Sequence, residues 1–198
     1  MAESIIEIRL IRNLRYKLSY IRIFETFLES NPGAEVAALL KALIEAQQSA
    51  IPPISRYLRQ HDVQVQDLEL DQRLLNHAFS REDVRSRLRF IYDGLTRAVA
   101  WYKTQLTDRQ MTADPELRAL LLELGEIDAA KLWRTEAVMN MLRISTNFKE
   151  KDWIDQERAQ PEQDDDWRPR LVEDVSRPGW HGQQSPRWPR PGKYRRGD

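Results

Sequence analysis

The stretch ELGEIDAAKLWRTEAV, residues Glu123–Val138, decides the fold and raises the question of what the fold encloses. Its flanks, LRALLL before it and MNML after it, are strongly apolar at helical spacing. This spacing predicts one long helix, because residues three and four apart lie on the same helix face. Asp128 and Lys131 fall where that face should be driest. The helix is therefore expected to carry a carboxylate and an ammonium group into the protein interior.

Two further helical segments precede this one in the first third of the chain. The first spans residues 3–30 and ends at SNPG, because proline cannot continue a helix and glycine permits a left-handed turn. Its expected apolar face consists of Leu10, Leu14, Leu18, Ile21 and Leu28. The second begins at Ala34. Pro52 and Pro53 remove two backbone donors within it, so a kink or a break is expected near Ala50.

The remaining helices follow a long connection, residues 61–79, which is expected to end in one short helix. Ser80 is the expected N-cap of the third long helix, because acidic residues follow it in the first turn. The fourth runs from Asp114 to about residue 145, with Asp114 as the cap and Pro115 at the first helical position.

The lengths of the connections predict the topology. Helices one and two, and helices three and four, are joined closely enough to form antiparallel hairpins. The long connection between the pairs can run the full length of a bundle. Two antiparallel hairpins joined by one long crossover is the ferritin-like arrangement of a four-helix bundle. The expected fold class is therefore all-α, with this bundle over residues 1–147 and an extended irregular C-terminal tail over residues 148–198.

Residues 3–145 also resemble ferritin-like domains in sequence. The phrases LLKALIEAQQSAIPPISRYLRQH and DPELRALLLELGEIDAAKLW contribute to this resemblance. The second is similar to the fourth-helix segment in which such families often carry a Glu-x-x-His pair. The resemblance implies an iron or manganese site, with a carboxylate from each of two helices and a Glu-x-x-His from each of the others.

The expected metal ligands are missing from this chain. None of its histidines follows a glutamate by three residues or lies centrally on a long helix: His61, His77 and His181. The matching positions of the fourth helix read Asp128 and Lys131. A charged lysine donates hydrogen bonds and cannot ligate a metal. The pair is therefore interpreted as a buried polar cluster that fills a vacated metal position, with Gln47 and Thr135 completing its hydrogen bonds. The sequence indicates no catalytic residue, no cofactor and no bound metal.

Three alternatives to this interpretation remain open. A slight rotation of the fourth helix would let Asp128 and Lys131 extend to water along their apolar stems. Lys131 could instead be a catalytic lysine with a lowered pKa. The chain could also be a di-metal oxidase or a metal-binding protein whose atypical site uses Glu25, Gln47 and Asp128.

The segment 148–198 has too few aliphatic residues to build a core of its own. It is rich in proline, acidic in its first part and basic in its last part. A disordered tail is one interpretation. The other is a tail that lies along a partner or along its own bundle, because aromatic rings can anchor in pockets and prolines lower the cost of ordering. The candidate binding residues are Trp153, Trp167, Trp180, Trp188, Arg187, Arg190 and Tyr194.

The composition limits the classes of partner. Lys+Arg and Asp+Glu are equal at 31 each, which disfavours general binding to nucleic acid or to membrane surfaces. The absence of cysteine excludes disulfides and thiolate metal sites. No stretch is apolar enough for a membrane span or a signal peptide, so a cytoplasmic location is expected.

The predicted function is that of a non-enzymatic, metal-free interaction or assembly module. It would dock to a larger protein complex through its C-terminal tail. A homodimer through Trp101 and Trp133 is a further expectation, and binding to nucleic acid through residues 177–198 is less favoured.

Overall fold

The computed structural model describes residues 4–63, 65 and 68–147, and within these ranges the chain is helical and has no strand. The all-α prediction is therefore confirmed for this part of the chain. The predictions for the tail, residues 148–198, lie outside the described residues. The described helices are α1 (Ile5–Glu29), α2 (Ala34–Gln60), α3 (Gln72–Phe79), α4 (Val84–Gln105), α5 (Arg109–Thr112) and α6 (Pro115–Met141).

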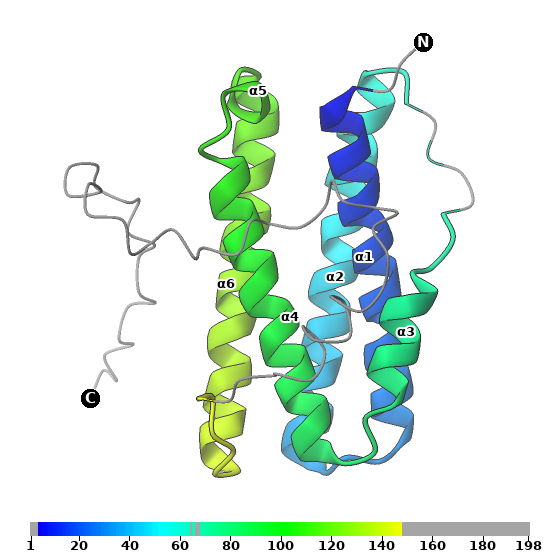
Figure 1. Ribbon diagram of the computed structural model, residues 1–198, viewed down its shortest axis with the longest axis vertical. Coiled ribbons are helices and arrows are strands. Elements are labelled where there is room, and N and C mark those ends of the chain that lie inside the picture. The colour runs from blue at the N-terminus through cyan, green and yellow to red at the C-terminus, as the bar shows by residue number, and fades with distance from the viewer. Residues whose placement is uncertain (1–3, 64, 66–67, 148–198) are drawn as a thin grey trace, which may run out of the picture. The chain divides into compact units, whose positions relative to one another are not determined.

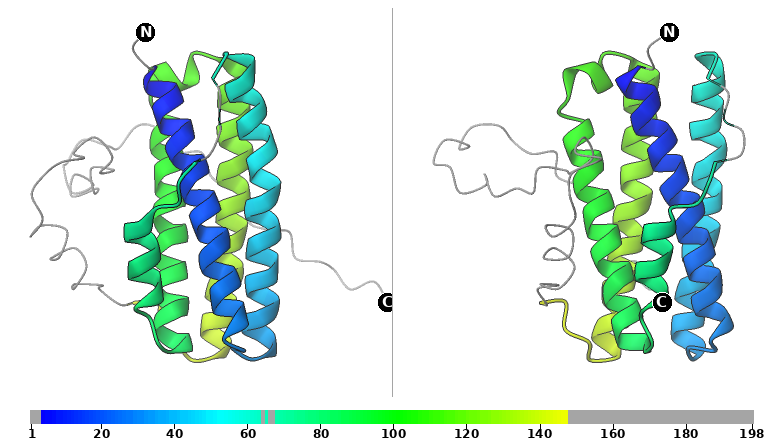
Figure 2. Two further views of the ribbon diagram at one scale, coloured as in Figure 1. Left: turned by 90° about the vertical axis from the view of Figure 1, so that its right-hand side faces the viewer. Right: turned by 45° about the vertical axis from the view of Figure 1, so that its right-hand side comes forward.

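The four long helices form two antiparallel hairpins that pack side by side (Figures 1 and 2). Helices α1 and α2 make the first hairpin, and α4 and α6 make the second, with the short α5 in its turn. The connection from α2 to α4 returns to the opposite end of the bundle and contains α3, which packs against α1. The expected connection and its short helix are therefore present, whereas α5 was not expected.

Aspartates are the N-caps of α3, α4, α5 and α6, and the N-cap of α4 differs from the predicted residue. Asp83, not Ser80, is the N-cap of α4, and its Oδ1 accepts a hydrogen bond of 2.9 Å from the Ser86 N–H. The backbone N–H and the hydroxyl of Ser80 instead donate to carbonyls at the end of α3. Asp and Ser are similarly good N-caps, so residue type alone does not fix the boundary.

The expected break near Ala50 is absent, because α2 continues unbroken through Pro52 and Pro53. These prolines leave the carbonyls of Gln48 and Ser49 without their helical donors. Gln48, Ser49 and Pro52 are exposed, so water can reach the carbonyls on this side of the helix. The opposite side of the same turn is held in the core by apolar packing.

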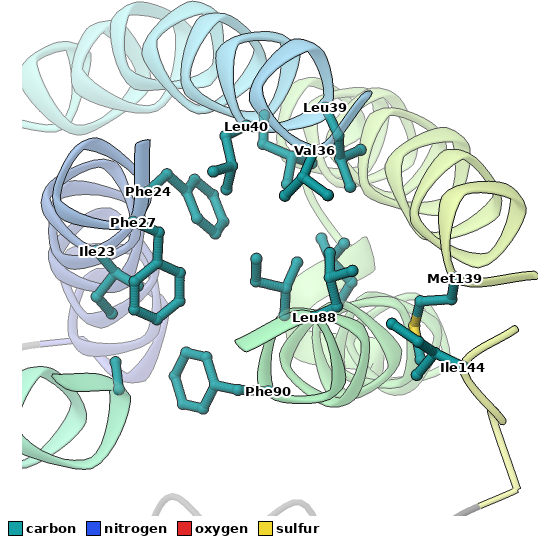
Figure 3. Close-up of a cluster of buried hydrophobic side chains, with 14 of the residues drawn as sticks. Ile23, Phe24, Phe27, Val36, Leu39, Leu40, Leu88, Phe90, Met139 and Ile144 are labelled. Carbon is teal, nitrogen blue, oxygen red and sulfur yellow. The ribbon is translucent and has the colours of Figure 1, made fainter. Parts of the chain in front are cut away.

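The apolar core consists of two clusters, one toward each end of the bundle. The cluster near the α1–α2 turn draws large side chains from all four long helices (Figure 3). Its labelled members include Phe24, Phe27, Leu40, Leu88 and Met139. The cluster at the α5 end is built around Leu10, Leu14, Ile54, Leu58, Tyr102, Leu117, Leu121 and Leu124.

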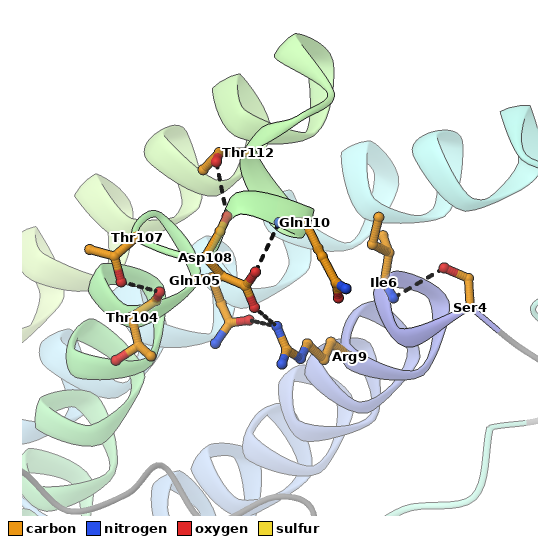
Figure 4. Close-up of polar contacts among 9 residues, drawn as sticks. All are labelled: Ser4, Ile6, Arg9, Thr104, Gln105, Thr107, Asp108, Gln110 and Thr112. Carbon is orange, nitrogen blue, oxygen red and sulfur yellow. Dashed lines mark hydrogen bonds and ion pairs between the residues drawn. The ribbon is translucent and has the colours of Figure 1, made fainter.

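Polar contacts join the two hairpins at the α5 end. Arg9 of α1 donates to Asp108 Oδ2 at 2.6 Å and to Gln105 Oε1 at 2.9 Å (Figure 4). The Tyr57 hydroxyl of α2 donates to Asp114 Oδ2 at 2.6 Å. Asp108 and Asp114 are the N-caps of α5 and α6, so these contacts fix the second turn against the first hairpin.

Gly94 lies inside α4 at a close approach to α1. A Cβ atom at this position would overlap the hydroxyl of Tyr20, and it would lie 3.0 Å from Tyr20 Cζ. Here the absence of a side chain gives the Tyr20 ring its place beside α4.

We expect Gly94→Ala to lower the free energy of unfolding, by about 1–3 kcal/mol, because of this overlap. An alanine inside a helix would otherwise raise stability by roughly 0.5–1 kcal/mol. Urea unfolding followed by circular dichroism measures the sign of the change in the free energy of unfolding. The same substitution in a Tyr20→Phe background should cost less, since the hydroxyl is gone. A stabilised Gly94→Ala single variant would contradict the close packing.

A buried lysine–aspartate layer as the candidate functional site

A layer of polar side chains separates the two apolar clusters, and each long helix contributes to it. Lys17 comes from α1, Gln47 from α2, Tyr102 from α4, and Asp128 and Lys131 from α6. All five side chains are buried. Apart from Tyr102, which also packs in the cluster at the α5 end, these side chains interrupt the apolar stripes of their helices.

Asp128 is the centre of this lysine–aspartate layer. Its Oδ1 accepts a hydrogen bond of 2.8 Å from Lys131 Nζ, and its Oδ2 lies 3.5 Å from Lys17 Nζ. Lys17 also donates to Gln47 Oε1 at 3.2 Å and lies over the Tyr102 ring, 5.8 Å from the ring centroid. One carboxylate therefore faces two ammonium groups from different helices.

The burial of Asp128 and Lys131 tests the alternative that both side chains extend to water. Asp128 is 2% exposed and Lys131 is 5% exposed, so neither side chain extends to water. The alternative of a rotated fourth helix is therefore wrong.

Gln47 and Thr135 were expected to complete the hydrogen bonds of Asp128 and Lys131, and the structure places both nearby but in other roles. Gln47 lies in the layer, but it accepts from Lys17 instead of contacting the α6 pair directly. Thr135 is buried, and its hydroxyl donates to the backbone carbonyl of Lys131 at 2.9 Å. Thr135 therefore satisfies a helix carbonyl and does not complete the hydrogen bonds of the two charged side chains.

Lys17 is the functional residue that sequence analysis missed. The expected apolar face of α1 included Leu18, Ile21 and Leu28, which are only half-buried. The face that packs inward is made of Leu10, Leu14, Lys17, Ser19, Ile23, Phe24 and Phe27. Lys17 follows Leu14 by three residues, and this helical spacing was the signal that could have found it.

The electrostatics of the layer distinguish its two lysines. Burial alone would raise the pKa of Asp128, but the ammonium groups of Lys17 and Lys131 outweigh it and hold this pKa below 3.8. Burial would lower the pKa of Lys17, but Asp128 and Tyr102 outweigh it and hold this pKa above 10.5.

Lys131 responds in the opposite direction. Burial lowers its pKa below 10.5, and the positive charge of Lys17 adds to this effect against the attraction of Asp128. Lys131 makes the shorter contact with Asp128, yet Lys17 has the additional partners Gln47 and Tyr102. Lys17 and Asp128 therefore form the more firmly charged pair, and Lys131 carries the layer's excess positive charge.

These residues do not fit the di-metal centre that the ferritin-like resemblance implies. The layer offers one carboxylate, no imidazole and two ammonium groups, which repel cations. Among the described residues, no group of three or more His, Cys, Asp or Glu side chains could hold a metal ion. Glu25 is eight residues beyond Lys17 on α1, about 12 Å along the helix axis, and is far from Asp128 along the bundle.

The tryptophans expected at a dimer face are not members of this layer. Trp133 is 37% exposed on α6, while Trp101 is half-buried and its ring centroid lies 4.9 Å from that of Tyr102. The homodimer through these tryptophans stays a prediction. The seven candidate residues of the tail lie outside the described residues. Within the described ranges, no helix combines the length and apolar character that crossing a membrane requires.

Three comparisons with known proteins were made, and none gives a match. No family model, no curated protein and no solved structure matches this chain. The residues and geometry of the layer are therefore the basis for assigning a function.

Because one carboxylate serves two ammonium groups, we expect its loss to be the most damaging change in the layer. Asp128→Asn leaves two buried positive charges unbalanced and should cost about 3–5 kcal/mol of unfolding free energy. Lys131→Met leaves the Lys17–Asp128 pair intact and should cost roughly 1–2 kcal/mol. Urea unfolding of both variants, with circular dichroism to check helicity, measures the difference. Equal costs would show that Lys17 does not share the charge of Asp128.

Proposed function

We propose that this protein is a metal-free ferritin-like bundle that serves as a non-enzymatic interaction or assembly module. The observation that carries the proposal is the pair of ammonium groups on Asp128, at 2.8 and 3.5 Å, inside a layer built by all four long helices. In ferritin-like metalloproteins, inward-facing ligands from the four helices hold the metal ions. Here Lys17 and Lys131 supply positive charge from the chain itself.

The arrangement of the helices supports the family assignment in this proposal. Two antiparallel hairpins and one long connection, rather than four helices joined by short loops, characterise ferritin-like bundles. The connection between α2 and α4 spans residues 61–83 and returns along the bundle, as that topology requires.

The state of the charged groups supports a structural role over a catalytic one. Asp128 has a pKa below 3.8 and is paired with two cations, so it is a poor general base near neutral pH. Lys131 donates to Asp128 at 2.8 Å, and this contact opposes the neutral amine that a nucleophilic lysine needs. Asp128, which is ionised and already paired with two cations, has little chemistry left to perform.

The docking role in this proposal falls to the C-terminal tail. Trp180 and Trp188 alternate with prolines and arginines, which favours recognition by a partner with apolar pockets and acidic rims. The sequence of the tail supports this role, and its residues lie outside the described ranges.

The test of the metal-free role is the metal content of the full-length chain. Protein produced with iron and manganese in the medium should contain far less than one metal ion per chain by elemental mass spectrometry. A matched variant, Lys17→Glu with Lys131→His, replaces the two repelling charges with two ligands, which join Asp128 as a third, and should therefore gain metal. About two metal ions per unsubstituted chain would overturn the proposal.

The docking role is tested by substituting the tail tryptophans and comparing the size of the complexes that the chain forms in the cells that produce it. The full-length chain should elute with a larger assembly on size-exclusion chromatography. Trp180→Ala with Trp188→Ala should shift it to the size of the isolated protein, because two aromatic anchors are lost. Gln183→Ala with Gln184→Ala, in the same segment, is the matched control and should leave elution unchanged. Identical elution of the tryptophan variant would contradict docking through the tail.

A further inference from the structure

A groove between α2 and α6 opens beside the lysine–aspartate layer. Its volume is about 260 Å³, and five of its seven lining residues are apolar. Ala42 and Ala46 line it from α2, and Ala130 lines it from α6. Small side chains on both helices leave this space open to solvent. The other two lining residues are basic, Lys131 and Arg134.

The basic residues of this α2–α6 groove have hydrogen-bonding capacity to spare. An ammonium group has three donors. Among the described residues, the Lys131 ammonium has one acceptor, Asp128 Oδ1. Arg134 is exposed, and within the described part of the chain it has no ion-pair partner. None of the described residues that line the groove is acidic. The groove therefore presents cationic donors that an anion can accept from.

The charge of the layer favours a singly charged occupant. Two ammonium groups face one carboxylate, so the buried cluster carries one excess positive charge, and Lys131 is the member of the cluster that lines the groove. A second carboxylate next to Lys131 would balance it. Coulomb attraction is stronger here than in water, because Lys131 is 95% buried by the protein around it (5% exposed).

The shape of the groove favours a small molecule with an apolar body. Its lining residues run from Ala42 to Ala46 on α2, about 6 Å along the axis, and from Ile127 to Arg134 on α6, about 10 Å. A volume of about 260 Å³ suits a small molecule and is too small for a helix of a partner protein. The alanine methyl groups offer no hydrogen bonds, so an occupant must cover them with apolar groups.

We propose that the α2–α6 groove binds a small amphipathic carboxylate of the fatty-acid class. Its carboxylate accepts hydrogen bonds from Lys131 and Arg134, and its apolar chain covers Ala42, Ala46 and Ala130. This inference goes beyond the proposed assembly role and does not depend on the tail or on the family assignment. It assigns a ligand to the excess positive charge of the layer.

The test is titration calorimetry of the full-length chain with sodium octanoate below its micelle concentration. We expect saturable binding at one site. Arg134→Gln and Lys131→Met should each weaken it about tenfold, which corresponds to the loss of one charge-assisted hydrogen bond. Lys41→Gln removes an exposed lysine of α2 that does not line the groove, and it should leave binding unchanged.

The dependence of octanoate affinity on pH supplies a second measurement. Lys131 must be protonated to hold a carboxylate. The charged groups that act on it are Asp128 on its own helix and Lys17 of α1, while Gln47 of α2 and Tyr102 of α4 contact Lys17. Because burial and Lys17 lower the pKa of Lys131, affinity should fall as pH rises through the alkaline range below 10.5. Lys131→Met should lack this fall, and an unchanged pH profile in that variant would overturn the assignment.

Three other results would overturn the proposal. Equal affinity for 1-octanol would show that the charges do not contribute, and equal affinity for inorganic phosphate would show that the alanines do not. Unchanged octanoate binding in Ala46→Phe, which fills the groove, would place the ligand elsewhere. If Lys131→Met does not fold, Arg134→Gln and Ala46→Phe decide the outcome, because Arg134 is exposed and Ala46 is only half-buried.

Discussion

The carboxylate of Asp128, fixed in the interior of a helical bundle, is the constraint on which the arrangement depends. A buried carboxylate without partners would cost several kcal/mol, so cations must reach it from the helices around it. Lys17 reaches it from α1 and Lys131 from α6, while Gln47 of α2 and Tyr102 of α4 contact Lys17. Apolar side chains tolerate small shifts of one helix along another, whereas these contacts require atoms to meet within a few tenths of an ångström. We infer that the layer sets the register of the four helices.

Stability and specificity come from different parts of this core. The apolar clusters on either side of the layer supply the burial that drives folding. A buried ion pair is often no more stabilising than apolar residues of the same volume, and its best-attested role is to select one packing among several. In this chain the layer also divides the core, so a shift of α6 by one turn would bury Asp128 and Lys131 against apolar side chains.

The sequence predicted the helices well because periodicity and caps are local signals, but it did not predict every inward face. The flanks of Asp128 and Lys131 are apolar on one face, so their burial could be read directly. On α1, Leu18 and Ile21 make a second apolar face, and tertiary packing, mainly against α2, selects the face that contains Lys17. The prediction that Ser80 caps α4 was wrong for a related reason, since Ser80 is the C-cap of α3 and Asp83 is the N-cap of α4. Tertiary contacts and neighbouring elements, not propensity, decided both cases.

The number of carboxylates follows from the choice of cation. A pair of divalent metal ions needs several carboxylates for charge balance, which ferritin-like metalloproteins place on all four helices. Two ammonium groups need at most two carboxylates, so α2 and α4 can contribute the uncharged Gln47 and Tyr102 instead of acids. The layer contains one carboxylate only, and Lys17 engages it with the help of Gln47. The remaining charge lies on Lys131, the member of the layer that lines the α2–α6 groove, where an external anion can complete the balance.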